Sequence, residues 1–226
     1  MVLDEMKLTL HNVSYQGELL IRDKPRPYVQ FNQLNHELTF GKVYHIACER
    51  DWDALGYNRL ISGIITPQTG EISIDGVVCN PKKLRRISWH LRYEEIRRWG
   101  IFRQNIKNQI RRGIQKGNRY PLSENDYIRH FLLTPSRYLR YITQVSSEAW
   151  RASCAIGMAN DRQIFCFPAV EHWRRMSGVS SGFIQDYGEL WLFDMLALMK
   201  PFNCLILLPL PPDTESSHFC DEIIMI

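Results

Sequence analysis

The segment that decides the fold runs from Gly41 to Gly76 and reads GKVYHIACERDWDALGYNRLISGIITPQTGEISIDG. Its first part is apolar at 43–47 and predicts a buried strand. Apolar residues then recur at helical spacing, at Leu55, Leu60, Ile61 and Ile64. The stretch 67–70 has the composition of a turn, and 71–78 predicts a hairpin around Asp75-Gly76. Strand, helix and hairpin in this order predict an α/β domain.

The residues between that strand and that helix stand in the place of a phosphate-binding loop but lack its chemistry. Such a loop reads G-x-x-x-x-G-K-[ST]. Its glycines let backbone N–H groups face the phosphates, its lysine reaches the outer phosphates, and its hydroxyl holds Mg²⁺. In this chain the first glycine falls at Cys48, the last at Asp53, the lysine at Ala54 and the hydroxyl residue at Leu55.

The acidic residues of this stretch also argue against a nucleotide. Glu49, Asp51 and Asp53 put up to three carboxylates where phosphate oxygens would lie, and no cation at Ala54 offsets the repulsion. We therefore expect no ATP or Mg²⁺ cofactor, no bound metal and no ATP hydrolysis.

The segment 41–76 aligns without a gap with the start of an ABC ATPase domain, and the chain resembles that family over nearly its full length. The resemblance implies a P-loop NTPase-like α/β core with an antiparallel β subdomain and a helical subdomain, in one domain over 1–226. It assigns 1–104 to the β subdomain and the first part of the core. The helical subdomain then covers 105–185, and 186–226 forms the C-terminal part of the core.

Local signals place further elements within this frame. Ser123 and Asp126 have the spacing of a capping box, and Thr134-Pro135 is a second helix start. The stretch 16–30 contains Gly and Pro residues and predicts a loop. Residues 220–226 resemble the strand that closes the family's core.

The resemblance assigns three residues to a vestigial nucleotide site. Tyr15, at the end of the first predicted strand, matches an aromatic residue that stacks on adenine in the family. Gln104 matches a glutamine that contacts Mg²⁺ and nearby water. In one register Leu190 to Asp194 is the Walker B strand. Asp194 is then its magnesium-directing aspartate, and Met195 replaces the general-base glutamate.

A second register stays open for the C-terminal third. In it, Ser180-Ser181-Gly182 is the remnant of the family's signature motif, and Leu205 to Leu208 is the Walker B strand. The two acids that follow that strand then become Pro209 and Leu210. In both registers the signature motif is damaged, the catalytic glutamate is absent, and no histidine stands at the switch position.

The resemblance also implies partners, namely a transmembrane permease and a second nucleotide-binding subunit. It places the permease contact at Trp99, Phe102 and Gln104, beside the start of the helical subdomain. The longest apolar run, Cys204 to Leu208, is too short to span a bilayer. The N-terminal residues lack the apolar region of a signal peptide. We therefore expect a cytoplasmic protein that is peripheral to the membrane and contacts it only through partners.

Charge and cysteine content exclude little. The net charge is +4, but the basic residues gather from Lys82 to Arg119, opposed only by Glu94 and Glu95. Such a stretch is either a solvated helical face or a docking face for nucleic acid, anionic lipid headgroups or an acidic protein, and no nucleic-acid motif accompanies it. The six cysteines show no C-x-x-C pair, which predicts neither a zinc site nor a disulfide framework.

The leading hypothesis is a catalytically inactive ABC ATPase-like subunit of a transporter complex. It would be paired with an active nucleotide-binding domain and docked on a permease. Two alternatives stay open. One is a regulatory subunit that binds ATP weakly through Tyr15, Gln104 and Asp194. The other is a scaffold outside transport that docks through its basic stretch.

Overall fold

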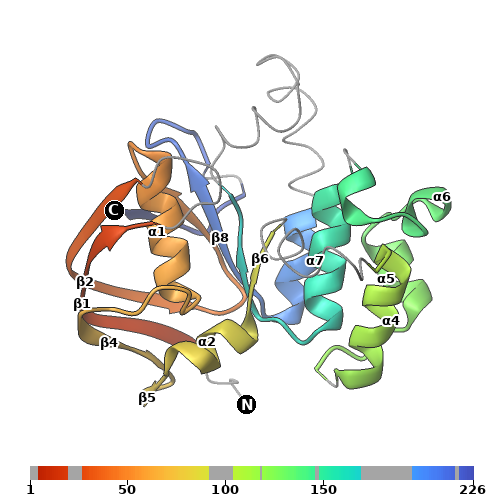
Figure 1. Ribbon diagram of the computed structural model, residues 1–226, viewed down its shortest axis with the longest axis horizontal. Helices are drawn as coiled ribbons and strands as arrows, with labels where there is room; N and C mark the ends of the chain where they lie inside the picture. Colours follow the sequence, from red (N-terminus) through yellow and green to blue (C-terminus); the bar gives the residue numbers. More distant parts are fainter. Residues whose placement is uncertain are drawn as a thin grey trace.

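Two sheets and a group of helices build the molecule, with the parallel sheet between an antiparallel sheet and the helices (Figure 1). The computed structural model describes residues 5–19, 27–91, 104–117, 119–145, 148–168, 195–216 and 219–226. The α/β architecture that the sequence predicts is confirmed.

The antiparallel sheet has the strand order β2-β1-β4-β5. Its strands are β1 (Lys7–Glu18), β2 (Tyr28–Thr39), β4 (Thr69–Ile74) and β5 (Val77–Val78). Asp75 and Gly76 both have positive φ between β4 and β5, as a type I′ hairpin turn requires. The loop predicted over 16–30 is wrong at its ends, because Gly17 pairs with Val29 in the β1–β2 ladder.

The second sheet is parallel throughout, in the order β6-β7-β8-β3-β9. Its strands are β3 (Val43–Ala47), β6 (Ser88–His90), β7 (Ile164–Cys166), β8 (Leu205–Leu210) and β9 (Glu222–Met225). β3 pairs with β8 on one side and β9 on the other, so the predicted closing strand is confirmed. Because β8 also pairs with β7, both of its edges are occupied.

The two faces of the parallel sheet bury different side chains, as the period of a strand requires. Tyr44, Ile46 and Leu205 face a core shared with the antiparallel sheet and α1 (Asp51–Ile61). Val43 and Ile206 face a second core shared with the helices. Helix α1 therefore lies between the two sheets and directly follows the C-terminal end of β3 (Figure 1).

Helices α4 (Ile106–Lys116), α5 (Glu124–His130), α6 (Pro135–Tyr138) and α7 (Ala149–Ala159), with the 3-10 turn η1 (Ile142–Gln144), form the helical part. Ser123 and Asp126 cap α5 reciprocally and α6 begins at Pro135, which confirms both predicted helix starts. α4 packs closely on the end of α7, because a Cβ at Gly113 would lie 2.6 Å from the carbonyl oxygen of Ala159.

The predicted helical range 105–185 is wrong at β7. Residues Ile164, Phe165 and Cys166 pair with β6 and β8 inside the parallel sheet. A short apolar run that is buried on both sides has no period that separates a strand from a helix, which is why the sequence did not reveal it. Farther along the chain, residues 195–199 are helical and η3 (Lys200–Phe202) leads into β8.

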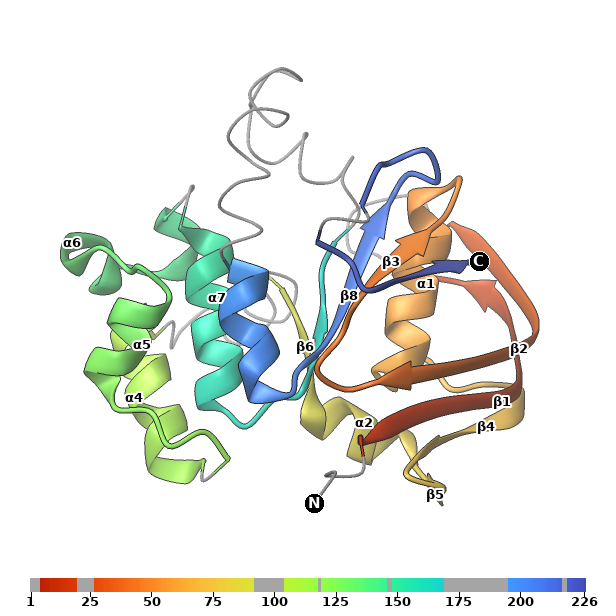
Figure 2. The ribbon, with the colours of Figure 1, turned by 180° about the vertical axis from the view of Figure 1, so that it is seen from behind.

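The basic stretch from Lys82 to Arg119 is divided between two places. Its first residues lie on α2 (Pro81–Ile87), which is followed directly by β6 of the parallel sheet. Later ones lie on α4, in the helical part (Figure 2). The described basic residues therefore do not form the single docking face that the scaffold alternative assumed.

Candidate nucleotide site

The C-terminal ends of β3, β6, β7 and β8 lie at the same edge of the parallel sheet, because these strands are parallel neighbours. In open α/β sheets this edge is where ligands bind. The junction between β3 and α1 is at this edge, so the residues from Cys48 onward are the candidate site.

The turn between β3 and α1 is short. β3 ends at Ala47 and α1 begins at Asp51, which leaves the three residues 48–50 as the connection. None of these three has a positive φ, whereas Gly41, Gly63, Gly70 and Gly76 all do. Backbone N–H groups converge on an anion when left-handed residues alternate with right-handed ones. This turn therefore lacks the backbone shape of a phosphate cradle.

An internal ion pair covers the first turn of α1. Nε of Arg50 donates to Asp53 Oδ2 over 2.7 Å, and Nη2 donates to Oδ1 over 2.8 Å. This forked geometry is the stronger form of an arginine–carboxylate pair, and it raises the pKa of Arg50. The positive end of a helix attracts anions, and here the Asp53 carboxylate, paired with Arg50, lies in the first turn of that helix.

The two positions that would carry the lysine and the hydroxyl are turned into the protein. The Ala54 side chain is fully buried. The Leu55 side chain packs against the core between the two sheets. The Leu55 side chain is therefore directed toward apolar neighbours, and the buried Ala54 side chain offers no charge to a bound phosphate.

The end of β7 offers no carboxylate either. Its strand is followed by Phe167 and Pro168, and the Phe167 carbonyl accepts a 2.9 Å hydrogen bond from Nδ2 of buried Asn58 on α1. Mg²⁺ in phosphoryl-transfer sites is held by carboxylate and hydroxyl oxygens. In the described residues the space between α1 and the end of β7 is bridged by a direct protein contact.

The end of β8 is tied down by a histidine of β3. His45 is fully buried; its Nε2 lies 3.2 Å from the Leu210 carbonyl oxygen and its Nδ1 lies 2.7 Å from Ser216 Oγ. Because a carbonyl oxygen only accepts, Nε2 carries the proton, and in the neutral ring Nδ1 accepts from the hydroxyl. This contact fixes the segment that follows β8 against β3.

Comparison with solved structures gives the architecture a name. The chain superposes on cbiO1 from Clostridium perfringens, part of the ABC transporter complex cbiONQ, with a TM-score of 0.67, 12% identity and coverage of 98% of this chain and 85% of that one. It superposes on MJ0796, a bacterial ABC transporter cassette, with a TM-score of 0.65, 16% identity and coverage of 97% and 94%. A putative ABC transporter ATP-binding protein from Pyrococcus furiosus gives a TM-score of 0.63, 15% identity and coverage of 97% and 96%.

The chain has the fold of an ABC ATP-binding cassette. At these identities the likeness concerns the fold alone. No protein-family model matches the chain, and no curated protein matches it. Among the residues that the structure describes, no helix is long and apolar enough to cross a membrane.

The predicted site residues lie in different parts of this fold, and some lie outside the described residues. Tyr15 is half-buried on β1 against the core between the sheets. Gln104 is exposed just before α4, and its carbonyl accepts a hydrogen bond from Gln109. Neither side chain is hydrogen-bonded to the described turn 48–50. The nucleotide contacts predicted for Tyr15 and Gln104 stay predictions. Asp194, Trp99 and Phe102 lie outside the described residues.

Met195, the position assigned to the missing general base, is buried in the core on the helical side. It begins the described helix 195–199. The assignment of this position to the family's general base stays a prediction, because residues 190–194 lie outside the described residues.

Sequence reasoning missed three residues that shape the site. Arg50 could have been recognised from its spacing of three residues to Asp53 at a helix start. The contacts of Asn58 and His45 could not be predicted, because their partners at Phe167 and Ser216 are far away in the sequence. Polar residues in the middle of apolar segments were the visible hint.

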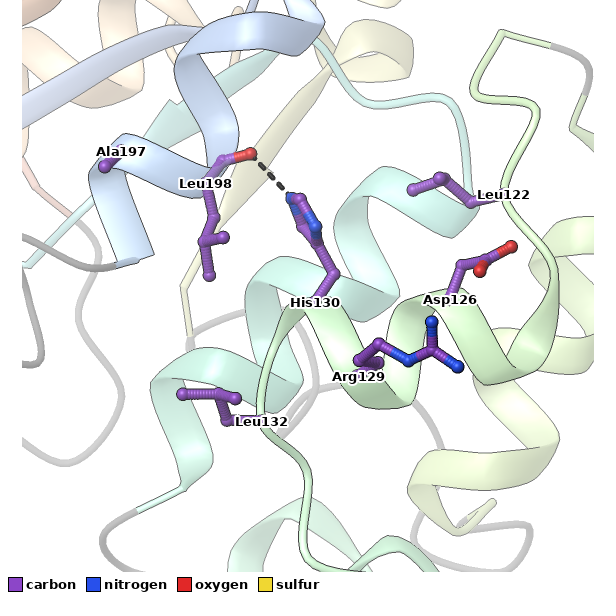
Figure 3. Close-up of a pocket in the computed structure, with 7 residues that line it drawn as sticks. All are labelled: Leu122, Asp126, Arg129, His130, Leu132, Ala197 and Leu198. Atoms are coloured by element: carbon purple, nitrogen blue, oxygen red, sulfur yellow. Dashed lines mark hydrogen bonds between the residues drawn. The ribbon is translucent and has the colours of Figure 1, made fainter.

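A separate hollow of about 590 Å³ lies between α5 and the helix 195–199 (Figure 3). His130 on its wall has Nε2 2.9 Å from the Leu198 carbonyl oxygen, and Asp126 is occupied in capping α5. Arg129 is the one cation among the lining residues, which are Leu122, Asp126, Arg129, His130, Leu132, Ala197 and Leu198. The hollow has neither a glycine-rich turn nor paired cations, so we do not assign a nucleotide to it.

Proposed function

We propose that this chain is a cassette-fold subunit of an ABC transporter-like complex that neither binds Mg-ATP tightly nor hydrolyses it. The observation that carries the proposal is the forked Arg50–Asp53 pair on the first turn of α1. It puts a protein carboxylate at the helix end where an active cassette would bind a phosphate.

Two further features support the proposal. The buried Ala54 offers no cation to the outer phosphates. The end of β7 offers Phe167 and Pro168 where a metal-binding site would need oxygen ligands. ATP and Mg²⁺ therefore do not fit the described residues, and we assign no catalytic step to them.

The proposed role is structural within a pair of cassettes. The solved cassettes that resemble this chain include one described as part of a transporter complex and one described as dimeric. We propose that the chain pairs with an active nucleotide-binding subunit and docks on a transmembrane permease at the cytoplasmic face of the membrane. Docking through Trp99, Phe102 and Gln104 is part of this proposal.

The test begins with copurification of the chain from its native source. We expect an active cassette subunit and a multi-span membrane protein in the complex. ATP turnover of that complex should be abolished when the P-loop lysine of the active subunit is replaced by alanine, because that subunit supplies all of the hydrolysis. Turnover that persists in this variant would show that the present chain is catalytic.

A docking variant separates the partner claim from the catalytic claim. Phe102→Asp puts a charge into the predicted apolar contact, so the chain should no longer copurify with the coexpressed, detergent-solubilised permease. Gln30→Asp serves as the control, because it adds the same charge at an exposed position of β2. Equal copurification of both variants with the permease would overturn the docking site while leaving the proposed inactivity untouched.

A further inference from the structure

One end of the molecule combines exposed apolar and exposed basic side chains. The hairpin β4–β5 and helix α2 follow each other in the chain and lie at the same end of the molecule in both views (Figures 1 and 2). Val77 and Val78 on β5 are 59% and 56% exposed. The cations on α2 are all exposed: Lys82, Lys83, Arg85 and Arg86. We call these six residues the β5–α2 patch.

The cations of the patch have no carboxylate partner in the described part of the chain. Arg85 Nε donates weakly to the Pro81 carbonyl oxygen over 3.3 Å, and no ion pair involves the other three. The nearest acid on the hairpin, Asp75, accepts a 2.8 Å hydrogen bond from the backbone N–H of Lys7. Residues 75–87 carry four cations and one carboxylate, a net charge of +3.

Helix α2 is held firmly enough to present these cations outward. Asn80 caps it by accepting a 2.8 Å hydrogen bond from the backbone N–H of Lys83. Leu84 is buried in the core between the sheets. Arg162 donates to the backbone carbonyl oxygens of Arg85 and Arg86. The four exposed basic side chains can therefore contact a partner outside the described residues.

The geometry points to an anionic lipid surface as the occupant of the β5–α2 patch. Cations attract the negative headgroups, and neighbouring apolar side chains enter the headgroup boundary. A nucleic acid fits less well, because 75–87 contains no aromatic residue on which a base could stack and its valines would face phosphates. This direct lipid contact needs no membrane partner and stands independently of the proposed function.

The experiment measures binding of the full-length chain to vesicles by sedimentation. Vesicles of phosphatidylcholine with phosphatidylserine should bind the chain, with affinity falling as salt rises, and vesicles of phosphatidylcholine alone should bind it much more weakly. A triple variant, Lys82→Gln with Lys83→Gln and Arg86→Gln, should lose about five-fold per cation, or about a hundred-fold in all.

A matched triple variant on α4 is the control for net charge. Lys107→Gln with Arg112→Gln and Lys116→Gln removes the same charge from basic residues that also have no ion-pair partner among the described residues. This control should stay within about three-fold of the parent chain. Val77→Ser with Val78→Ser should weaken vesicle binding by about three- to ten-fold, because less apolar surface enters the boundary.

Three results would overturn the inference. The first is failure of the parent chain to bind phosphatidylserine vesicles at low salt. The second is equal loss in the α2 and α4 triple variants, which would mean that total charge and not this patch decides binding. The third is binding to a polyglutamate peptide that the α2 variant loses, without vesicle binding, which would assign the patch to an acidic protein. Thermal melting of each variant shows that its fold is retained.

Discussion

The β4–β5 hairpin and the turn between β3 and α1 differ in a way that separates what the fold needs from what a nucleotide needs. Gly70 near the start of β4 and Gly76 in the turn between β4 and β5 both have positive φ. The turn between β3 and α1 has Cys48 and Asp53 where a phosphate loop has glycines, and residues 48–50 have no positive φ.

The difference follows from what each glycine would touch. A Cβ at Gly70 would lie 2.3 Å from the carbonyl oxygen of Asn12, so the antiparallel sheet itself requires glycine there. The glycines of a phosphate loop serve the ligand, because they let N–H groups face it. The chain thus retains the glycines that its sheets require and lacks those that only a phosphate would require.

A lysine at position 54 should destabilise the fold without creating a nucleotide site. Because Ala54 is fully buried, Ala54→Lys places an ammonium away from water and should lower the free energy of unfolding by about 3–5 kcal/mol. Chemical denaturation measures this loss.

The control for this change is Glu49→Lys, which adds a cation at an exposed position of the same turn. It should change stability by less than about 0.5 kcal/mol. If Ala54→Lys is tolerated as well as this control, position 54 faces an open pocket and the turn is closer to a working phosphate loop than the structure indicates.

The folded protein should lose stability in acid because of buried His90 on β6. His90 at the end of β6 is buried, with Nε2 2.6 Å from Ser62 Oγ beyond α1. Burial, together with the charge of Arg59, lowers the pKa of His90 to about 3. In the unfolded chain the pKa of His90 has its ordinary value of about 6.5, so the unfolded chain binds the proton before the folded chain does as the pH falls.

The sign of the effect is therefore fixed. The contribution of neutral His90 to stability is complete above about pH 6.5 and declines toward pH 3, by up to about 1.4 kcal/mol per pH unit. Chemical denaturation between pH 7 and pH 4 tests this, with His90→Gln as the comparison. A slope that is equal in the parent chain and in His90→Gln would contradict it.

The hairpin glycines should differ from each other. Gly70→Ala combines a positive φ of 76° with a contact to backbone and should cost at least about 2 kcal/mol. Gly76→Ala has a φ of 73° but meets no atom within 4 Å, so it should cost only about 1 kcal/mol. Denaturation of both variants measures the difference. Equal losses would mean that the approach of Asn12 does not explain why Gly70 is present.

Much of the frame could be predicted because local patterns specify it. The alternation before Asp75-Gly76 predicted the hairpin, and the spacing of Ser123 and Asp126 predicted the start of α5. Both depend on neighbours within a few residues. β7 was missed for the opposite reason, since its three apolar residues gain their strand partners from β6 and β8, far away in the sequence.

In the candidate site, too, local patterns were predictable and long-range contacts were not. The replacement of glycine, lysine and hydroxyl was readable at Cys48, Ala54 and Leu55 because a motif has fixed spacing. The contacts that now surround this turn could not be predicted from the sequence. The orientation of Ala54 into the core depends on packing, and the hydrogen bond from Asn58 to Phe167 joins residues separated by 109 positions.

The most direct test of the account is thermal melting of the isolated chain with and without millimolar Mg-ATP. A ligand present at a hundred times its dissociation constant adds about 2.7 kcal/mol to stability, which corresponds to a shift of roughly 5–10 °C for a chain of this size. An active cassette protein melted alongside shows that the conditions suffice. We predict no shift for this chain, because Asp53 and Arg50 occupy the helix end and Ala54 is buried. A clear upward shift would contradict the central claim and establish a nucleotide site in this protein.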